Sequence, residues 1–154
     1  MIFARSHYDP VYVSEIQNSR RRRMGWDMPY CRQGTWGADF YKVAPLPDEV
    51  IVTKHRYDAF HGTDLELILR TNGVQNLLFA GVATNVCVES TLRGAYMRDF
   101  MPVLVADCCA ARNTRAHEAS LENVRTYFGL VATAGDIEQT WAATATKPRR
   151  AAAL

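Results

Sequence analysis

The sequence has no apolar run that approaches the ~20 residues a membrane-spanning helix requires, and its first residues lack the long apolar segment of a secretory signal. It also has little excess charge, since 18 lysines and arginines stand against 16 aspartates and glutamates, for a formal net charge of +2. So small a net charge does not call for a nucleic acid or a membrane as a partner. We therefore expect a cytoplasmic protein with neither kind of partner, whose ligands must be inferred from individual sites.

Residue spacing suited to metal binding is missing as well. The four histidines contain no H-x-x-x-H pair, and no C-x-x-C pair occurs among the four cysteines, which are Cys31, Cys87, Cys108 and Cys109. Adjacent cysteines are poorly placed to bridge each other. We expect reduced thiols, no metal and no cofactor.

Short apolar or β-branched runs alternate with amphipathic stretches along the chain. The runs predict strands near 2–4, 49–53, 77–81, 103–106 and 130–133, with helices between them and a final helix near 136–142. This alternation is typical of an α/β fold with a doubly wound, mostly parallel sheet and helices on both faces. Because 154 residues suffice for one such core, we expect a single domain over residues 1–145 and a disordered tail over residues 146–154.

The segment from Val11 to Phe40 is polar and long for a connection inside a compact domain. It is either an excursion over the active-site face or partly mobile. Its four consecutive arginines, Arg20 to Arg23, could attract an anionic partner, although such a run is more often a solvated face. The pattern does not decide between these alternatives.

The chain is organised around residues 77–92, where an apolar run stops at small residues and continues as an amphipathic helix. Cys87 therefore falls at a helix N-terminus, where the helix dipole and unpaired backbone N–H groups stabilise a thiolate. The same donors can hold an oxyanion. Cys87 is either a nucleophile or a small buried cysteine that fills space beneath the helix.

Two further polar residues lie at predicted strand ends. Lys54 follows the strand at 49–53, and it is either exposed to solvent or, if that end is a cleft, a cation that stabilises a thiolate or transfers a proton. His7 follows the first strand, where stabilising a turn or lining the rim of a substrate site is favoured over binding a metal.

Four segments follow one another along the chain: Gly34-Thr35, Lys54 to Phe60 (KHRYDAF), Gly62 to Leu65 (GTDL) and Gly81 to Thr91 (GVATNVCVEST). In their order and residues they resemble the isochorismatase-like cysteine hydrolases, and the resemblance covers residues 34–133. The second and fourth are most similar to the branch of ureidoacrylate amidohydrolases, biuret hydrolases and N-carbamoylsarcosine amidases. The resemblance implies a Rossmann-like three-layer fold and a catalytic triad of aspartate, lysine and cysteine.

In this chain the resemblance places the catalytic lysine at Lys54 and the nucleophile at Cys87. It also implies a cis peptide bond between Val82 and Ala83, and an oxyanion hole formed by the N–H groups of Ala83 and Cys87. Weaker candidates for substrate binding are three residues beside these motifs, each of which could equally be a packing residue: Asn85, Tyr57 and Phe60.

The sequence also departs from the family. Relatives carry the catalytic aspartate at the end of a first strand, which the resemblance places between the strands of Ile2 and Gly81, and no segment here matches it. Neither Asp9 nor Asp39 fits that motif. Asp58 stands where relatives often have a small residue, and it is either a charge at the rim or a disturbance of the pocket. We expect the first strand, and the general base with it, to be missing.

Together these patterns predict a cysteine-dependent amidohydrolase, assembled as a homo-oligomer, that acts on a small-molecule substrate. It would cleave a C–N bond of a ureide, carbamoyl or amide compound through a thioester intermediate. The alternative is a truncated or inactive relative that serves as a non-catalytic binding or subunit protein, because a fold alone does not imply activity.

Overall fold

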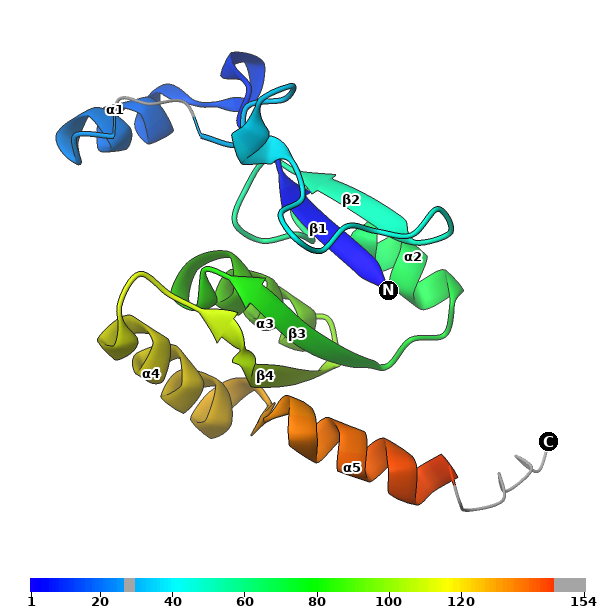
Figure 1. Ribbon diagram of the computed structural model, residues 1–154. Helices are drawn as coiled ribbons and strands as arrows, with labels where there is room; N and C mark the ends of the chain where they lie inside the picture. Colours follow the sequence, from blue (N-terminus) through cyan, green and yellow to red (C-terminus); the bar gives the residue numbers. More distant parts are fainter. Residues whose placement is uncertain (27–29, 146–154) are drawn as a thin grey trace. The chain divides into compact units, whose positions relative to one another are not determined.

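The computed structural model of this protein describes residues 1–26 and 30–145 (Figure 1). The chain divides into two compact units, Met1–Val74 and Gln75–Leu154, here called unit 1 and unit 2, and each contains its own parallel sheet. The predicted α/β class is confirmed, whereas the tail predicted for residues 146–154 lies outside the described residues. In the described part of the chain, no helix is both long and apolar enough to cross a bilayer.

Unit 1 is built on two parallel strands. Strand β1 (Ile2–Ser6) pairs with β2 (Val50–Lys54), with Ser6 opposite Lys54, and the β-branched residues of β2 favour this extended pairing. Because the strands are parallel, Ser6 and Lys54 reach the same carboxyl edge of the sheet. The other elements of the unit are η1 (Pro10–Tyr12), α1 (Glu15–Arg23), η2 (Trp36–Ala38) and α2 (Leu65–Thr71).

The segment between Val11 and Phe40 contains a helix, α1, that the sequence analysis did not predict. The Ser14 side chain accepts a hydrogen bond from the Gln17 backbone N–H, and the Gln17 side chain accepts one from the Ser14 backbone N–H. The arginine run forms the last turn, where cations interact favourably with the helix dipole. No residue of α1 is buried, and the helix lies apart from β1 and β2 (Figure 1). Arg20 lies over the Trp26 ring and Arg21 over the Tyr30 ring, at 5.2 and 4.8 Å from the ring centroids.

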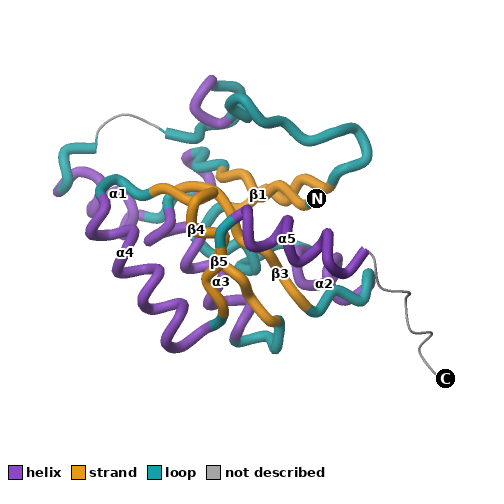
Figure 2. The backbone as a smooth tube through the Cα atoms, turned by 60° about the horizontal axis from the view of Figure 1, so that its bottom comes forward, coloured by secondary structure: helices purple, strands orange, loops and turns teal. Residues whose placement is uncertain are grey.

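Unit 2 holds a three-stranded parallel sheet in the order β3–β4–β5, with strands Asn76–Val82, Met101–Ala110 and Leu130–Ala132. Figure 2 draws these strands in orange. The connections are helical, as parallel neighbours require: η3 (Thr84–Val88) and α3 (Glu89–Tyr96), then α4 (Thr114–Asn123) and η4 (Val124–Phe128). Both η3 and η4 are π-helical turns, and α5 (Ala134–Ala145) follows β5. The predicted alternation of strands and helices is present, with β4 longer than expected.

Helices α3 and α4 cover one face of this sheet. Leu92 of α3, Leu104 of β4 and Val124 of η4 are fully buried in one cluster with Val88 and Leu121. Each such side chain contributes roughly 1.5–3 kcal/mol when it is fully buried. This packing gives the residues between β3 and α3 a fixed support.

Gly129 is predicted to tolerate no side chain. A methyl group on Gly129 would come 2.2 Å from the carbonyl oxygen of Pro102, which is too close for any contact. Gly129→Ala should therefore lower the free energy of unfolding by roughly 1–3 kcal/mol, measured by chemical denaturation. Gly135→Ala in α5 is the control, since its methyl group would meet only the Thr133 hydroxyl at 3.8 Å. Equal stability of Gly129→Ala and the parent protein would contradict this close approach.

Candidate active site

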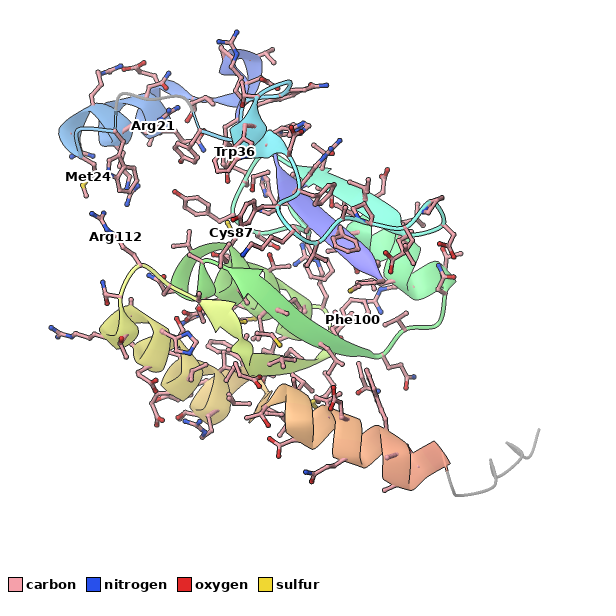
Figure 3. All side chains as sticks on the ribbon, in the orientation of Figure 1. Arg21, Met24, Trp36, Cys87, Phe100 and Arg112 are labelled. Carbon is pink, nitrogen blue, oxygen red and sulfur yellow. The ribbon has the colours of Figure 1, made fainter. Side chains whose placement is uncertain are left out.

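The expected nucleophile lies just beyond the carboxyl end of β3 (Figure 3). β3 ends at Val82, the Val82–Ala83 peptide bond is cis as the resemblance implies, and Ala83 is extended. The backbone N–H groups of Val86 and Val88 then donate to the Ala83 carbonyl oxygen, at 3.1 and 3.3 Å. Cys87 is thus held in a helical turn between a strand and α3, which is the placement expected from the sequence.

Two threonine hydroxyl groups form hydrogen bonds in and around this turn. Thr84 is completely buried, and its Oγ1 lies 2.9 Å from Nδ1 of His117 on α4. Thr91 of α3 donates its hydroxyl to the Cys87 carbonyl oxygen at 2.7 Å. Cys87 itself is only partly buried, so the turn fixes the cysteine without closing it off from solvent.

A buried carboxylate follows directly after the turn. Glu89 begins α3 and is 8% exposed. Its oxygens accept hydrogen bonds from Arg93 Nε (3.0 Å), Ser120 Oγ (2.5 Å) and Asn123 Nδ2 (3.3 Å). These partners offset the cost of burying the charge. Since Ser120 and Asn123 belong to α4, the network joins the start of α3 to α4.

Lys54 occupies the last position of β2 and is only 3% exposed. The interpretation of Lys54 as a solvent-exposed lysine is therefore wrong. Its Nζ donates to Ser6 Oγ at 2.9 Å and to the Arg56 carbonyl oxygen at 3.0 Å. These bonds hold the ammonium group at the carboxyl edge of the β1–β2 sheet.

Two histidines lie at the same edge. The backbone N–H of His7 donates to the Lys54 carbonyl oxygen at 2.9 Å, and Nδ1 of His55 lies 2.7 Å from the His7 carbonyl oxygen. The His55 ring stacks on Tyr12, with ring centroids 3.6 Å apart. Burial, followed by the charge of Arg5, lowers the pKa of His7. The neutral imidazole is therefore favoured at that position.

The weaker candidates for substrate binding differ in exposure. Tyr57 is 39% exposed and Asn85 is also exposed, whereas Phe60 is buried at 6% exposure, as its packing alternative would require. Asp58 Oδ1 accepts a hydrogen bond from the Phe60 backbone N–H at 2.8 Å, so this carboxylate stabilises the turn after β2. A role in substrate binding for Tyr57, Phe60 and Asn85 stays a prediction.

The residues of the candidate site divide between the two units. Lys54, Tyr57 and Phe60 belong to unit 1, and the Cys87 turn belongs to unit 2; that the two sets form one site stays a prediction. Sequence reasoning missed Ser6 and His117 as supporting residues. For Ser6 a signal existed, because two parallel strands ending at Ser6 and Lys54 place them side by side. Among the described residues, no cluster of three His, Cys, Asp or Glu side chains is arranged to hold a metal ion.

Comparison with known proteins identifies relatives that match most of this chain. Residues 2–136 match the isochorismatase domain. A ureidoacrylate amidohydrolase of Methylorubrum extorquens is 34% identical over 145 residues, covering 85% of this chain and 58% of that protein. An isochorismatase-like hydrolase of Alkaliphilus metalliredigens has a TM-score of 0.78 at 30% identity, over 91% of this chain and 72% of that one. A nicotinamidase/pyrazinamidase of Bacillus subtilis has a TM-score of 0.73 at 29% identity, over 85% and 73%.

The chain spans less than two thirds of the length of the curated relatives it matches, 58% in the case of the M. extorquens protein. The matched region nevertheless runs from β1 to the start of α5 and contains both Lys54 and Cys87. The similarity to the A. metalliredigens hydrolase extends over 91% of this chain. This chain therefore belongs to the isochorismatase family.

Proposed function

We propose that this protein is a cysteine-dependent amidohydrolase that cleaves a C–N bond of a small ureide, carbamoyl or amide compound. The observation that carries the proposal is the position of Cys87 in a helical turn at the carboxyl end of a parallel strand. Open α/β sheets bind their ligands at this edge, and a helix N-terminus favours a thiolate. The activity named for the M. extorquens relative, ureidoacrylate amidohydrolase, supports the substrate class.

The reaction begins when the Cys87 thiolate attacks the carbonyl carbon of the substrate. A C–S bond forms, the C=O π electrons move onto oxygen, and the N–H groups of Ala83 and Cys87 stabilise this oxyanion. Collapse of the tetrahedral intermediate re-forms the C=O bond and breaks the C–N bond, and the leaving amine takes up the proton that the general base removed from the Cys87 thiol. Water then hydrolyses the thioester, which releases the acid and regenerates the thiol.

Lys54 supplies a cation to the same site in this proposal. Its ammonium group is buried and already oriented by Ser6 Oγ and the Arg56 carbonyl oxygen. A charge that is positioned before the reaction stabilises developing negative charge without the cost of reorienting it. Tyr57, Phe60 and Asn85 are proposed to contact the substrate.

The general base is proposed to be an aspartate on a strand that residues 1–154 do not contain. By resemblance this strand lies between β1 and β3, and among the described residues β1 pairs only with β2, and β3 only with β4. Both are thus edge strands, with backbone groups that a further strand can pair with. Asp9 is the first aspartate of residues 1–154, and its carboxylate accepts a hydrogen bond from the Gln33 backbone N–H at 3.1 Å.

Cys87 should be the most readily alkylated of the four thiols near neutral pH. It lies partly buried at a helix N-terminus, whereas burial raises the pKa of Cys109 and disfavours its thiolate. Iodoacetamide labelling of the folded protein, followed by peptide mass spectrometry, measures the rate at each cysteine. Cys108 is the control for accessibility because it is exposed. Labelling of Cys108 as fast as Cys87 would remove the support for an activated nucleophile.

Joining a family-type first strand that ends in aspartate to the N-terminus should raise both activity and stability. The strand supplies ladder partners, and the aspartate supplies acid–base catalysis worth ~10²–10⁴-fold in rate. The matched control is the same strand ending in asparagine, which should raise the thermal unfolding midpoint equally without the gain in rate. Biuret, ureidoacrylate and N-carbamoyl amines serve as substrates.

The outcomes of this grafting experiment test the position of the general base and the choice between an enzyme and a non-catalytic protein. Turnover by the unmodified chain at the rate of the aspartate graft would place the base within residues 1–154. A folded aspartate graft without turnover would favour the alternative, a non-catalytic binding or subunit protein. Light scattering on the same samples tests the proposed homo-oligomer, which a monomeric mass would contradict.

In the aspartate graft, Lys54→Met should lower kcat by a larger factor than it raises KM. Methionine keeps an aliphatic side chain in the buried position but removes the charge. The substitution should therefore remove an interaction that stabilises the transition state more than the bound substrate. Steady-state kinetics of Lys54→Met and of Lys42→Met, which alters an exposed lysine, measure the effect and its control. A change confined to KM would make Lys54 a substrate-binding residue instead.

A further inference from the structure

We propose that His117 is a positioning residue for Cys87, on which it acts through Thr84. Thr84 is the first residue of η3 and is completely buried, and its Oγ1 lies 2.9 Å from Nδ1 of His117. His117 lies on α4 and is itself partly buried. The inference rests on the proposed role of Cys87 as the nucleophile, and it assigns a role to a histidine that the reaction scheme does not use.

The contact between His117 and Thr84 attaches the first residue of the turn to α4, and Glu89, which follows the turn, is hydrogen-bonded to α4 as well. Glu89 accepts these bonds from Ser120 Oγ at 2.5 Å and from Asn123 Nδ2 at 3.3 Å. His117 and Ser120 are three residues apart, so they lie on one face of α4. Thr84 begins η3 and Glu89 begins α3. Cys87 therefore lies between two residues that are both attached to one face of α4.

Helix α4 is itself stabilised at its N-terminus and by its buried side chains. Asn113 caps its N-terminus by accepting a hydrogen bond from the Ala116 N–H at 2.9 Å, and Leu121 belongs to the buried cluster beneath it. The turn itself has only five residues, and they adopt a π-helical conformation. π-Helical turns are rare in proteins, and those that occur are often found at functional sites. Thr84 and Cys87 are three residues apart in this turn, so a shift of Thr84 would also move Cys87.

The chemistry of the two partners defines the variants that test the contact. A threonine hydroxyl can both donate and accept, so the bond can form with either tautomer of His117. Asparagine places an amide atom near the position of Nδ1 and has a helix propensity similar to that of histidine. Leucine fills the space without a polar atom. Glutamine places its amide farther from the backbone, near the position of Nε2.

The rate of Cys87 alkylation in the folded 154-residue chain is the measurement, because it needs no substrate. His117→Leu should lower this rate by about two- to ten-fold, the range that corresponds to one hydrogen bond. His117→Asn should restore most of the rate, and His117→Gln should not. Thr84→Val should reproduce the loss, and adding His117→Leu to it should cause little further loss.

Controls separate positioning from general stability. Glu118→Leu alters an exposed residue of the same helix and should leave the Cys87 rate unchanged, and the Cys108 rate should stay constant in every variant. If His117→Leu fails to fold, the comparison of His117→Asn with His117→Gln provides the same test. A lower thermal midpoint with an unchanged Cys87 rate would make His117 merely structural and overturn the inference.

The failure of the proposed nucleophile gives a different result. If Cys87 in the unmodified chain is alkylated no faster than Cys108, the proposed function loses its support before any substitution is made. If Cys87 is reactive in the unmodified chain and equally reactive in His117→Leu, the proposed function stands and the positioning role of His117 is wrong.

Discussion

At the carboxyl end of β3 the chain must pass from a strand into a helix while leaving Cys87 partly accessible, and much of unit 2 depends on this constraint. Thr84, three residues before the cysteine, and Glu89, two residues after it, are polar and buried. Burying polar groups without partners is costly, and α4 supplies partners for both, His117 and Ser120. The conformation of the turn and the position of α4 therefore depend on each other.

The apolar cluster beneath α3 and α4 makes this arrangement stable. Leu92 and Leu104 are fully buried, and they bring α3 and β4 together without specifying any one polar contact. Hydrophobic burial is non-directional, so it can hold the helices against the sheet but cannot orient a thiol. The directional hydrogen bonds at Thr84 and Glu89 provide that orientation.

In unit 1, the ammonium group of Lys54 is both buried and hydrogen-bonded. Lys54 is almost completely buried, and its ammonium group donates to a hydroxyl of the neighbouring strand and to a carbonyl two residues further along the chain. A buried charge is weak evidence for stability, because desolvation opposes the attraction. Its fixed orientation at a strand end is the observation on which the role proposed for Lys54 depends.

The regular elements of the fold could be predicted from the sequence because their signals are local. The apolar run that forms β3 and the amphipathic pattern of α3 are visible in the sequence itself, and so is Cys87 between them. Helix α1 was missed because it has no apolar face, and none of its residues is buried. Its capping residues Ser14 and Gln17 were a readable signal.

The supporting contacts of the site could not be predicted in the same way, because they join residues far apart in sequence. Ser6 and Lys54 are 48 residues apart, and Thr84 and His117 are 33 residues apart. The first pair follows from strand register once both strand ends are known. The second depends on how α4 lies across the sheet, which Leu121 and its apolar neighbours determine.

Proximity in sequence is consequently a poor guide to which residues assist Cys87 and Lys54. Ser6, which lies on another strand and 48 residues from Lys54 in the sequence, contacts the ammonium group directly. A motif names the residue that reacts, because the chemistry requires that residue type. The residues that orient it are selected by packing, so any side chain that the fold brings to the right place can serve.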